Sequence, residues 1–225
     1  MQKHEYISTL NLFESQDMFK LIKNYAKIKK YKKNKYIFMI RDTVEYIYIV
    51  KSGIVVTYGI DKHYNEKIFF LFTQGDFIND DSLGSNEFSY SCYAFNDCEL
   101  YYIEKQVFAN LVSNNNNLLN YILQSNSNKF SRLYRQLKNS NTFSTIDKKL
   151  CSKLWKLSRD FGTITSEGIE IDISINVVFL SKMLGSTRES VSRAIKKLCE
   201  QGILKINKRK IIIKDLNKLI RHIKS

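Results

Sequence analysis

Hydrophobic side chains change their spacing near residue 105, and this change limits the folds open to the chain. Residues 36–103 contain short runs rich in Ile, Val, Tyr and Phe, such as IYIV (47–50) and FFLF (69–72). Turn signals separate the runs, among them KSG (51–53) and QGD (74–76). Short strands at this spacing predict a small barrel or sandwich. After residue 105 the apolar positions recur at helical spacing, so we expect an α+β fold.

Positive charge is concentrated in the C-terminal third of the chain. The formal net charge is +14. Residues 141–225 hold 18 Lys and Arg against 8 Asp and Glu, whereas residues 36–140 hold 9 against 11. This balance predicts a polyanionic partner for the C-terminal third. The six lysines of KIKKYKKNK (27–35) are interpreted as a solvated face, with a second DNA or polymerase contact as the alternative.

The sequence argues against a membrane protein and against an enzyme. Its longest apolar runs are far shorter than a membrane span, and the first 17 residues carry charges where a signal peptide needs an apolar stretch. We therefore expect a cytoplasmic protein without a membrane partner, in which the four scattered cysteines remain thiols. A Ser/His/Asp set, metal-ligand spacing and a phosphate-cradling Gly loop are all missing, so neither catalysis nor a metal site is predicted.

A regular apolar seam runs along the helical segment 105–140. Its members are spaced 4, 3, 4, 3 and 4 residues apart, which is a heptad pattern. The helix either packs on its own domain or pairs with a second copy of the chain, and its polar flanks favour the dimer. An Asn within such a seam typically fixes register and oligomer number. The predicted dimer interface comprises Leu119, Leu123, Asn126, Phe130, Leu133 and Leu137.

The C-terminal third has the element order of a winged helix-turn-helix. We expect an amphipathic helix over 145–161, a loop with two glycines, and a strand over 169–175. A short helix over 177–184, a second helix from about residue 187 and a basic hairpin over 205–216 follow. In this motif the second helix enters the major groove of DNA.

The stretch GSTRESVSRAIKKLCEQGIL (185–204) has the features of a recognition helix. Gly185 has the place of a glycine that ends the first helix, and Ser186-x-x-Glu189 has the spacing of a capping box. Apolar side chains at 191, 194, 195 and 198 face the core, and the opposite side is polar. The alternative is an ordinary solvated face with an i,i+4 Glu189–Arg193 pair.

Each polar residue type on this face suits a group of DNA. Arg can donate two bonds to guanine, Glu can accept from cytosine, and Ser is small enough to approach thymine or a phosphate. The free amides at the start of the helix suit a phosphate, and basic residues at the tip of the hairpin suit the flanking backbone. The predicted DNA-binding residues are Ser186, Thr187, Arg188, Glu189, Ser192, Arg193, Lys196, Lys208 and Arg209.

Three segments resemble the Crp/Fnr transcription regulators. RESVSR (188–193) resembles their helix-turn-helix, IYIVKSGIVVTYGIDKHYNEKIFFLFTQGDFI (47–78) their effector-domain β-roll, and VFANLVSNNNNLLNYIL (107–123) the start of their long dimer helix. The resemblance covers nearly the whole chain. It implies a cyclic-nucleotide-binding-like β-roll (jelly roll) sensor domain over 1–104, a dimerisation helix over 105–140 and a winged helix-turn-helix DNA-binding domain over 141–225.

The same resemblance implies a homodimer on a palindromic site in double-stranded DNA, with contact to RNA polymerase. In the family, the positions that match Arg188, Glu189 and Arg193 read bases, and the position that matches Thr187 contacts phosphate. We expect a half-site with a TGA core. The predicted function is therefore effector-controlled transcription regulation. The alternative is an effector-independent regulator or architectural protein with a degenerate sensor domain.

The predicted effector pocket differs from that of cyclic-nucleotide binders. Those proteins carry a Gly-Glu pair and then an Arg-Ser pair after Q-G-D-F-I. Here Asn79 and Asp80 stand at the first pair, and Tyr90 and Ser91 at the second. Residues 68–104 contain no Lys or Arg and seven acids, so a cyclic phosphate would lack a cation and cAMP is not expected. A basic residue from the long helix, such as Arg132 or Arg135, is the alternative source of charge.

No cofactor is predicted for the chain. Iron–sulfur sensing of the Fnr type needs an N-terminal cysteine cluster, and the first cysteine here is Cys92. Heme ligation by His4, His63 or a cysteine stays open, although lone histidines are more often surface residues. Cys92 and Cys98 are interpreted as ordinary strand thiols, with a redox switch as the alternative.

Overall fold

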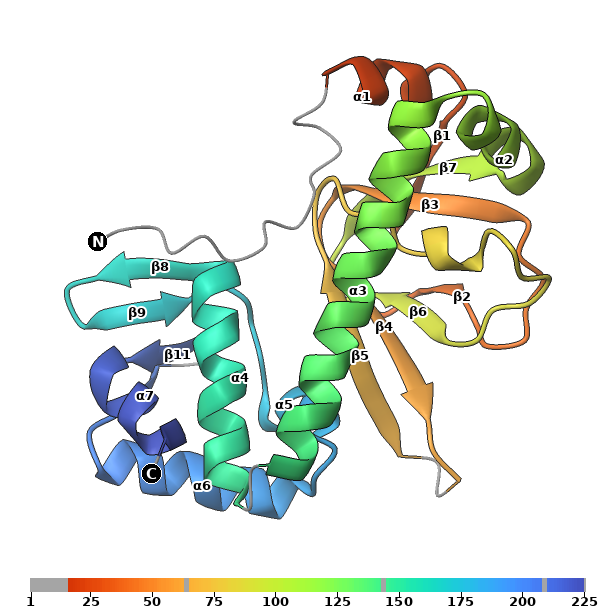
Figure 1. Cartoon of the computed structure of the whole chain (residues 1–225). Helices are drawn as coiled ribbons and strands as arrows, with labels where there is room; N and C mark the ends of the chain where they lie inside the picture. Colours follow the sequence, from red (N-terminus) through yellow and green to blue (C-terminus); the bar gives the residue numbers. More distant parts are fainter. Residues whose placement is uncertain (1–15, 63–64, 143–144, 208–209, 225) are drawn as a thin grey trace. The chain divides into compact units, whose positions relative to one another are not determined.

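A computed structural model describes residues 16–62, 65–142, 145–207 and 210–224 (Figure 1). The chain divides into two compact units, one of residues 1–59 with 69–134 and one of residues 60–68 with 135–225. The α+β class expected from the sequence is confirmed. No described helix is both long enough and apolar enough to cross a membrane.

The first unit is built on two antiparallel sheets. One has the order β1 (Lys27–Tyr31), β7 (Cys98–Glu104), β3 (Tyr46–Ser52). The other has the order β2 (Tyr36–Phe38), β6 (Ser91–Ala94), β4 (Val55–Ile60), β5 (Glu66–Phe72). One core cluster joins the two sheets, as Phe38, Val50, Phe72 and Leu100 show. The predicted β-roll is therefore confirmed, with β1 as a strand that the sequence analysis did not predict.

Helices cover the other face of the β1-β7-β3 sheet. They are α1 (Gln16–Lys23), α2 (Lys105–Ser113) and the N-terminal part of α3 (Asn116–Thr142), and Figure 1 shows them along this sheet. Strand β3 consequently has no solvent face, because Tyr48 and Val50 point into the roll while Ile47 and Ile49 point to the helices. Burial on both faces explains why IYIV lacks the polar alternation of a half-exposed strand.

The helical segment predicted over 105–140 is two helices rather than one. Helix α2 ends at Ser113, and the amide of Asn114 donates to carbonyls of the preceding turn. Asn115 then accepts a hydrogen bond from the amide of Leu118 through its side chain (2.9 Å) and so caps α3. Asn side chains compete with helical backbone bonds in this way, which explains a break within the run NNNN (114–117).

The lysine run 27–35 forms β1 and the turn after it. Strand β1 is at the edge of its sheet, where lysines prevent pairing with another chain. All six lysines are exposed, as the solvated-face interpretation expected. Lys30 lies 3.1 Å from Glu99 and Lys32 lies 2.8 Å from Asp97, so neighbouring acids balance part of the charge.

The second unit contains the predicted winged helix-turn-helix. Its helices are α4 (Ile146–Phe161), α5 (Val177–Leu184), α6 (Arg188–Glu200) and α7 (Leu216–Lys224). Its sheet has the order β10 (Leu204–Asn207), β11 (Lys210–Ile213), β9 (Gly168–Ile171), β8 (Gly162–Thr165). Helix α4 packs against α5, α6 and α7 (Figure 1). Its Leu150 and Leu154 are fully buried.

Three details of this unit differ from the prediction. The loop with two glycines contains strand β8, and the predicted strand 169–175 ends at Ile171. Ile173 and Ile175 are still buried, so their alternation reflects an extended segment without a ladder. The predicted hairpin 205–216 ends earlier, and α7 follows it. This helix is capped by the side chain of Asp215, which accepts from the amide of Lys218 (2.9 Å).

Gly53 provides a test of the turn between β3 and β4. Its φ is +86°, and a Cβ at this position would lie 2.6 Å from the carbonyl oxygen of Asp97. We expect Gly53→Ala to lower the free energy of unfolding by at least about 2 kcal/mol in urea titrations. Gly84→Ala is the control, since nothing lies within 4 Å of the added Cβ, and its effect should stay within about 0.5 kcal/mol. Equal losses in the two variants would contradict this account.

Candidate functional site

The turn between α5 and α6 is closed by Gly185. Its backbone is left-handed (φ 60°, ψ 51°), and its amide donates to the carbonyl of Ser181. The amide of Ser186 donates to the same carbonyl at 3.1 Å. Gly185 therefore ends α5 as the sequence predicted, in the conformation that glycine adopts without a steric penalty.

The residue that caps α6 is Thr187, and the predicted capping box of Ser186 and Glu189 is wrong. The Thr187 hydroxyl accepts from the amide of Ser190 at 3.2 Å. Because its amide takes part in closing the preceding turn, Ser186 belongs to that turn rather than to the start of α6. The cap thus shifts by one residue, and Glu189 lies one position too early for a capping box.

The two faces of α6 are as the sequence predicted. Val191, Ala194 and Leu198 are buried, and Ile195 is half-buried. The opposite face is exposed to solvent and carries the side chains proposed to meet base edges. Its members are Arg188, Glu189, Ser192, Arg193 and Lys196.

The alternative Glu189–Arg193 pair is not among the ion pairs of the described residues. Arg193 instead donates from its terminal nitrogen to the Ser190 hydroxyl at 3.2 Å. Hydrogen bonds from the Glu189 amide and from Thr187 lower the pKa of the Glu189 carboxyl below its usual value, and Arg188 and Arg193 add to this effect. The start of α6 therefore presents a carboxylate and two guanidinium groups to solvent.

One carboxylate holds α6 in its unit. Asp147 on α4 accepts from Lys197 on α6 at 2.7 Å, and the same oxygen lies 3.2 Å from Nε2 of His222 on α7. Burial acts to raise the pKa of Asp147, but the hydrogen bonds, first that from Lys197, hold it well below its usual range. Asp147 thus connects three helices, and sequence analysis assigned no role to it or to Lys197.

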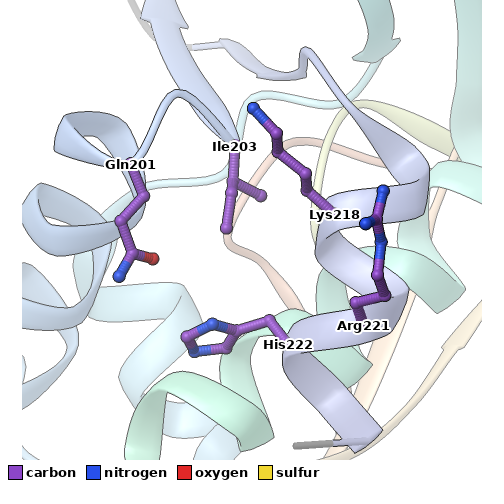
Figure 2. Close-up of a pocket in the computed structure, with 5 residues that line it drawn as sticks. All are labelled: Gln201, Ile203, Lys218, Arg221 and His222. Carbon is purple, nitrogen blue, oxygen red and sulfur yellow. The ribbon is translucent and has the colours of Figure 1, made fainter.

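A shallow basic hollow lies beyond the C-terminal end of α6 (Figure 2). Its volume is about 350 Å³, and its lining comes from α7 and from the connection between α6 and β10. Helix α6 has 13 residues and is about 20 Å long, so the hollow is far from the exposed face at the start of this helix. The lining residues are Gln201, Ile203, Lys218, Arg221 and His222.

The tip of the β10–β11 wing carried two of the predicted DNA-binding residues. Lys208 and Arg209 lie outside the described residues. Next to them, Lys210 lies 2.6 Å from Glu170 and 2.9 Å from Asp172, and these acids raise its pKa to about 12. Lys210 is therefore charged and is held by β9 and the residue that follows it.

The predicted effector residues Asn79 and Ser91 are bonded to the β-roll backbone. The Asn79 side chain accepts from the amide of Tyr48 (2.8 Å) and donates to the carbonyl of Tyr46 (2.9 Å). The Ser91 hydroxyl accepts from the amide of Ile40 at 2.9 Å. Both side chains are buried, so each joins strands or loops of the roll.

The other two predicted effector residues bond to neighbouring side chains. Tyr90 donates to Asp81 at 2.6 Å. Asp80 is buried and forms an ion pair with Lys129 of α3. The long helix does bring a cation to this loop, as the alternative prediction allowed, but the residue is Lys129. The guanidinium of Arg132 lies 5.0 Å from the centre of the Phe70 ring.

Most of the predicted dimer seam is exposed on α3. The amide oxygen of Asn126 is buried without a hydrogen-bond partner. Leu133 instead packs against the core of its own β-roll. An α-helix drifts relative to a strict heptad, which turns Leu133 inward and Tyr134 outward. The exposed fractions are 37% for Leu119, 58% for Leu123, 56% for Phe130, 70% for Tyr134 and 62% for Leu137.

The strand cysteines are poorly placed for redox chemistry. Cys92 and Cys98 are both buried free thiols. Burial raises the pKa of Cys98 to about 11 and the pKa of Cys92 well above its usual value. Because the thiolate is the reactive form, these environments favour the interpretation as ordinary core residues. Among the described residues, no group of three or more His, Cys, Asp or Glu side chains is arranged to hold a metal ion.

The cap of α6 yields a direct test. We expect Thr187→Ala to lower the free energy of unfolding by about 1 kcal/mol, because the amide of Ser190 loses its acceptor. Ser186→Ala should change it by less than about 0.5 kcal/mol. Urea titrations of both variants against the unmodified chain provide the measurement. If Ser186→Ala lowers the free energy of unfolding more than Thr187→Ala does, then Ser186 is the cap of α6, as the sequence predicted.

Comparison with known proteins agrees with this architecture. The protein-family model of the cyclic nucleotide-binding domain matches residues 28–115. The protein-family model of the Crp-like helix-turn-helix domain matches residues 148–222. The putative HTH-type transcriptional regulator ycf28 of Porphyra purpurea is 27% identical over 79% of this chain and 74% of its own length. The global nitrogen regulator of Synechococcus elongatus is 24% identical over 83% of this chain and 85% of its own length.

Solved structures share the fold at low sequence identity. FixK2 from Bradyrhizobium japonicum is 19% identical, with a TM-score of 0.75 over 87% of this chain and 96% of that chain. The c-di-GMP responsive global regulator CLP of Xanthomonas campestris is also 19% identical, with a TM-score of 0.78 over 89% of this chain and 99% of that chain. The two domain matches, together with the similar regulators, show that the chain belongs to the Crp/Fnr family of DNA-binding transcription regulators, which are not enzymes.

Proposed function

We propose that the protein is a cytoplasmic, sequence-specific regulator that binds a palindromic DNA site as a homodimer and contacts RNA polymerase. The observation that carries this proposal is the exposed polar face at the start of α6. This face belongs to a helix whose other side is buried. The ion pair between Lys197 and Asp147 also links the helix to α4. A rigid support of this kind is what base recognition requires, since a shift of a fraction of an ångström would spoil the hydrogen bonds.

The chemistry of this face matches the major groove. Arg188 and Arg193 can each donate two bonds to guanine, and Glu189 can accept from the amino group of cytosine. Thr187 and the free amides at the start of α6 suit a backbone phosphate. We expect half-sites with a TGA core that lie one helical turn apart, as two copies of a helix-turn-helix require.

The exposed stripe on α3 supports the dimer. Leu123, Phe130, Tyr134 and Leu137 place large apolar side chains in solvent along one side of a single helix. A second α3 would remove this surface from water.

DNA binding by the protein is either controlled by an effector bound to the β-roll or independent of one. In the first, an unidentified effector other than cAMP controls DNA binding without a metal or cofactor. In the second, DNA binding is independent of an effector. The second is favoured by the bonds of Asn79, Asp80, Tyr90 and Ser91, because all four side chains have protein partners.

DNA selection from a random duplex library tests the regulator function. The unmodified protein should select a palindrome at fixed physiological salt. Arg193→Ala should then reduce the ratio of specific to nonspecific affinity about 10- to 100-fold, since one bidentate base contact is lost. Arg159→Ala removes an equal charge from α4 and should leave this ratio unchanged. Failure of the unmodified protein to select any palindrome would disprove sequence-specific binding.

The dimer has its own test in solution. Phe130→Glu places a charge in the middle of the α3 stripe, so sedimentation should show a shift from dimer to monomer. Gln124→Glu introduces the same charge on the adjacent polar side of α3 and should remain dimeric. A Phe130→Glu protein that sediments as a dimer would place the interface elsewhere.

A further inference from the structure

A buried ion pair joins the β5–β6 connection to α3. Asp80 begins the short helix η2 (Asp80–Ser82) and is 2% exposed, and Lys129 is 9% exposed. The ammonium of Lys129 donates to Oδ1 of Asp80, and it lies 3.5 Å from the carbonyl oxygen of Ile78. The partners are 49 residues apart in the sequence, so the contact exists only in the folded unit.

The surroundings of Lys129 make a counter-ion necessary. Its ammonium lies 5.3 Å from the centre of the Phe72 ring, in the wall of the β-roll core. An ammonium removed from water costs several kcal/mol unless an anion and further acceptors meet it. Three acids of the same connection have different hydrogen-bond partners, and the charges of Arg132 and Lys129 also act to lower the pKa of Asp76. Asp76 accepts from Thr73, Asp81 accepts from Tyr90, and Asp80 accepts from Lys129.

Only one of the two carboxylate oxygens of Asp80 has a hydrogen-bond partner. Its second oxygen, Oδ2, is buried and has no hydrogen-bond partner. The carboxylate therefore supplies the negative charge that Lys129 needs while one of its two oxygens remains without a donor. A buried acceptor without a partner costs free energy, so the pair is not a fully satisfied hydrogen-bond network.

The position of the pair on α3 gives it influence over the dimer stripe. Leu118, Tyr121 and Ile122 anchor the N-terminal part of α3 in the helix-facing core. Further along, Lys129, Arg132 and Leu133 attach α3 to the core of the roll. Phe130, in the exposed stripe, follows Lys129 directly. Loss of the pair would therefore remove one of the contacts that hold the part of α3 that carries the stripe.

We propose that Asp80 is an internal counter-ion that occupies a small-carboxylate site at Lys129 and holds α3 on the β-roll without an external anion. This inference rests on the proposed regulator function and deepens its effector-independent form. The ligand class that would replace Asp80 is a small monocarboxylate, because the place is the size of one carboxyl group. Formate is the matching probe.

Chemical rescue of Asp80→Ala in the full-length protein is the test. Without formate, the variant should melt at least about 5 °C below the unmodified protein, because the Lys129 ammonium stays buried without the carboxylate that bonds to it. Millimolar formate should restore most of this loss in a saturable manner, and sodium chloride at equal ionic strength should not. The Asp97→Ala control opens the exposed Lys32–Asp97 pair and should show no formate dependence.

DNA affinity is the second measurement on the same proteins. We expect Asp80→Ala to bind the selected palindrome at least about tenfold more weakly and to recover with formate, while the unmodified protein ignores formate. A variant that melts like the unmodified protein, equal rescue by chloride, or unchanged DNA affinity would each overturn the inference. A rise in the DNA affinity of the unmodified protein with formate would also overturn it, since the site would then be open.

Further outcomes separate a folding defect of the variant from loss of the anion site. If Asp80→Ala does not fold without formate, folding induced by formate supports the inference, and failure to fold with formate overturns it. The double variant Asp80→Asn, Lys129→Met lacks both charges, so it should fold without any response to formate. If the unmodified protein selects no palindrome, the proposed function fails, whereas formate-dependent stability of Asp80→Ala would still establish the anion site.

Discussion

Burial of β3 on both faces is the constraint on which the first unit depends. A strand with Ile47 and Ile49 on one side and Tyr48 and Val50 on the other needs two hydrophobic layers. The second sheet of the roll supplies one layer, and α1, α2 and the start of α3 supply the other. Helix α3 is thus attached through one side, while its remaining sides stay open. The same packing that completes the core therefore creates the apolar stripe available to a second chain.

The DNA-binding unit depends on a polar interaction to a greater degree. The apolar face of α6 determines which side of the helix is buried, with Val191 and Leu198 in the core. The hydrogen bond between Lys197 and Asp147 adds a polar contact from α6 to α4, and His222 brings α7 to the same carboxylate. One carboxylate therefore connects three helices that also pack through their apolar faces.

Sequence patterns predicted what depends on local spacing. Short apolar runs placed six of the seven strands of the roll, β2 to β7. Gly185 was placed at its turn, and the polar face of α6 was assigned residue by residue. The failures have specific physical causes. Thr187 replaces Ser186 as the cap because the amide of Ser186 closes the preceding turn by donating to the carbonyl of Ser181. Lys129 escaped notice because its partner lies 49 residues away, and no periodicity reports such a contact.

Net charge alone overstates the surface available to DNA. Of the basic residues that gave the C-terminal third its excess, Lys197, Lys205 and Lys210 form ion pairs with acids of their own unit. Those pairs hold the helices and the sheet together. Arg188 and Arg193 differ in kind, because they are exposed at the start of α6. In the proposed function, specificity would rest on these few guanidinium groups, and the lysines paired with acids would contribute less to it. The β-roll unit gives another example of a lysine paired within the fold. Lys129 forms an ion pair with Asp80, so its charge is neutralised locally and adds little to the electrostatic attraction of DNA.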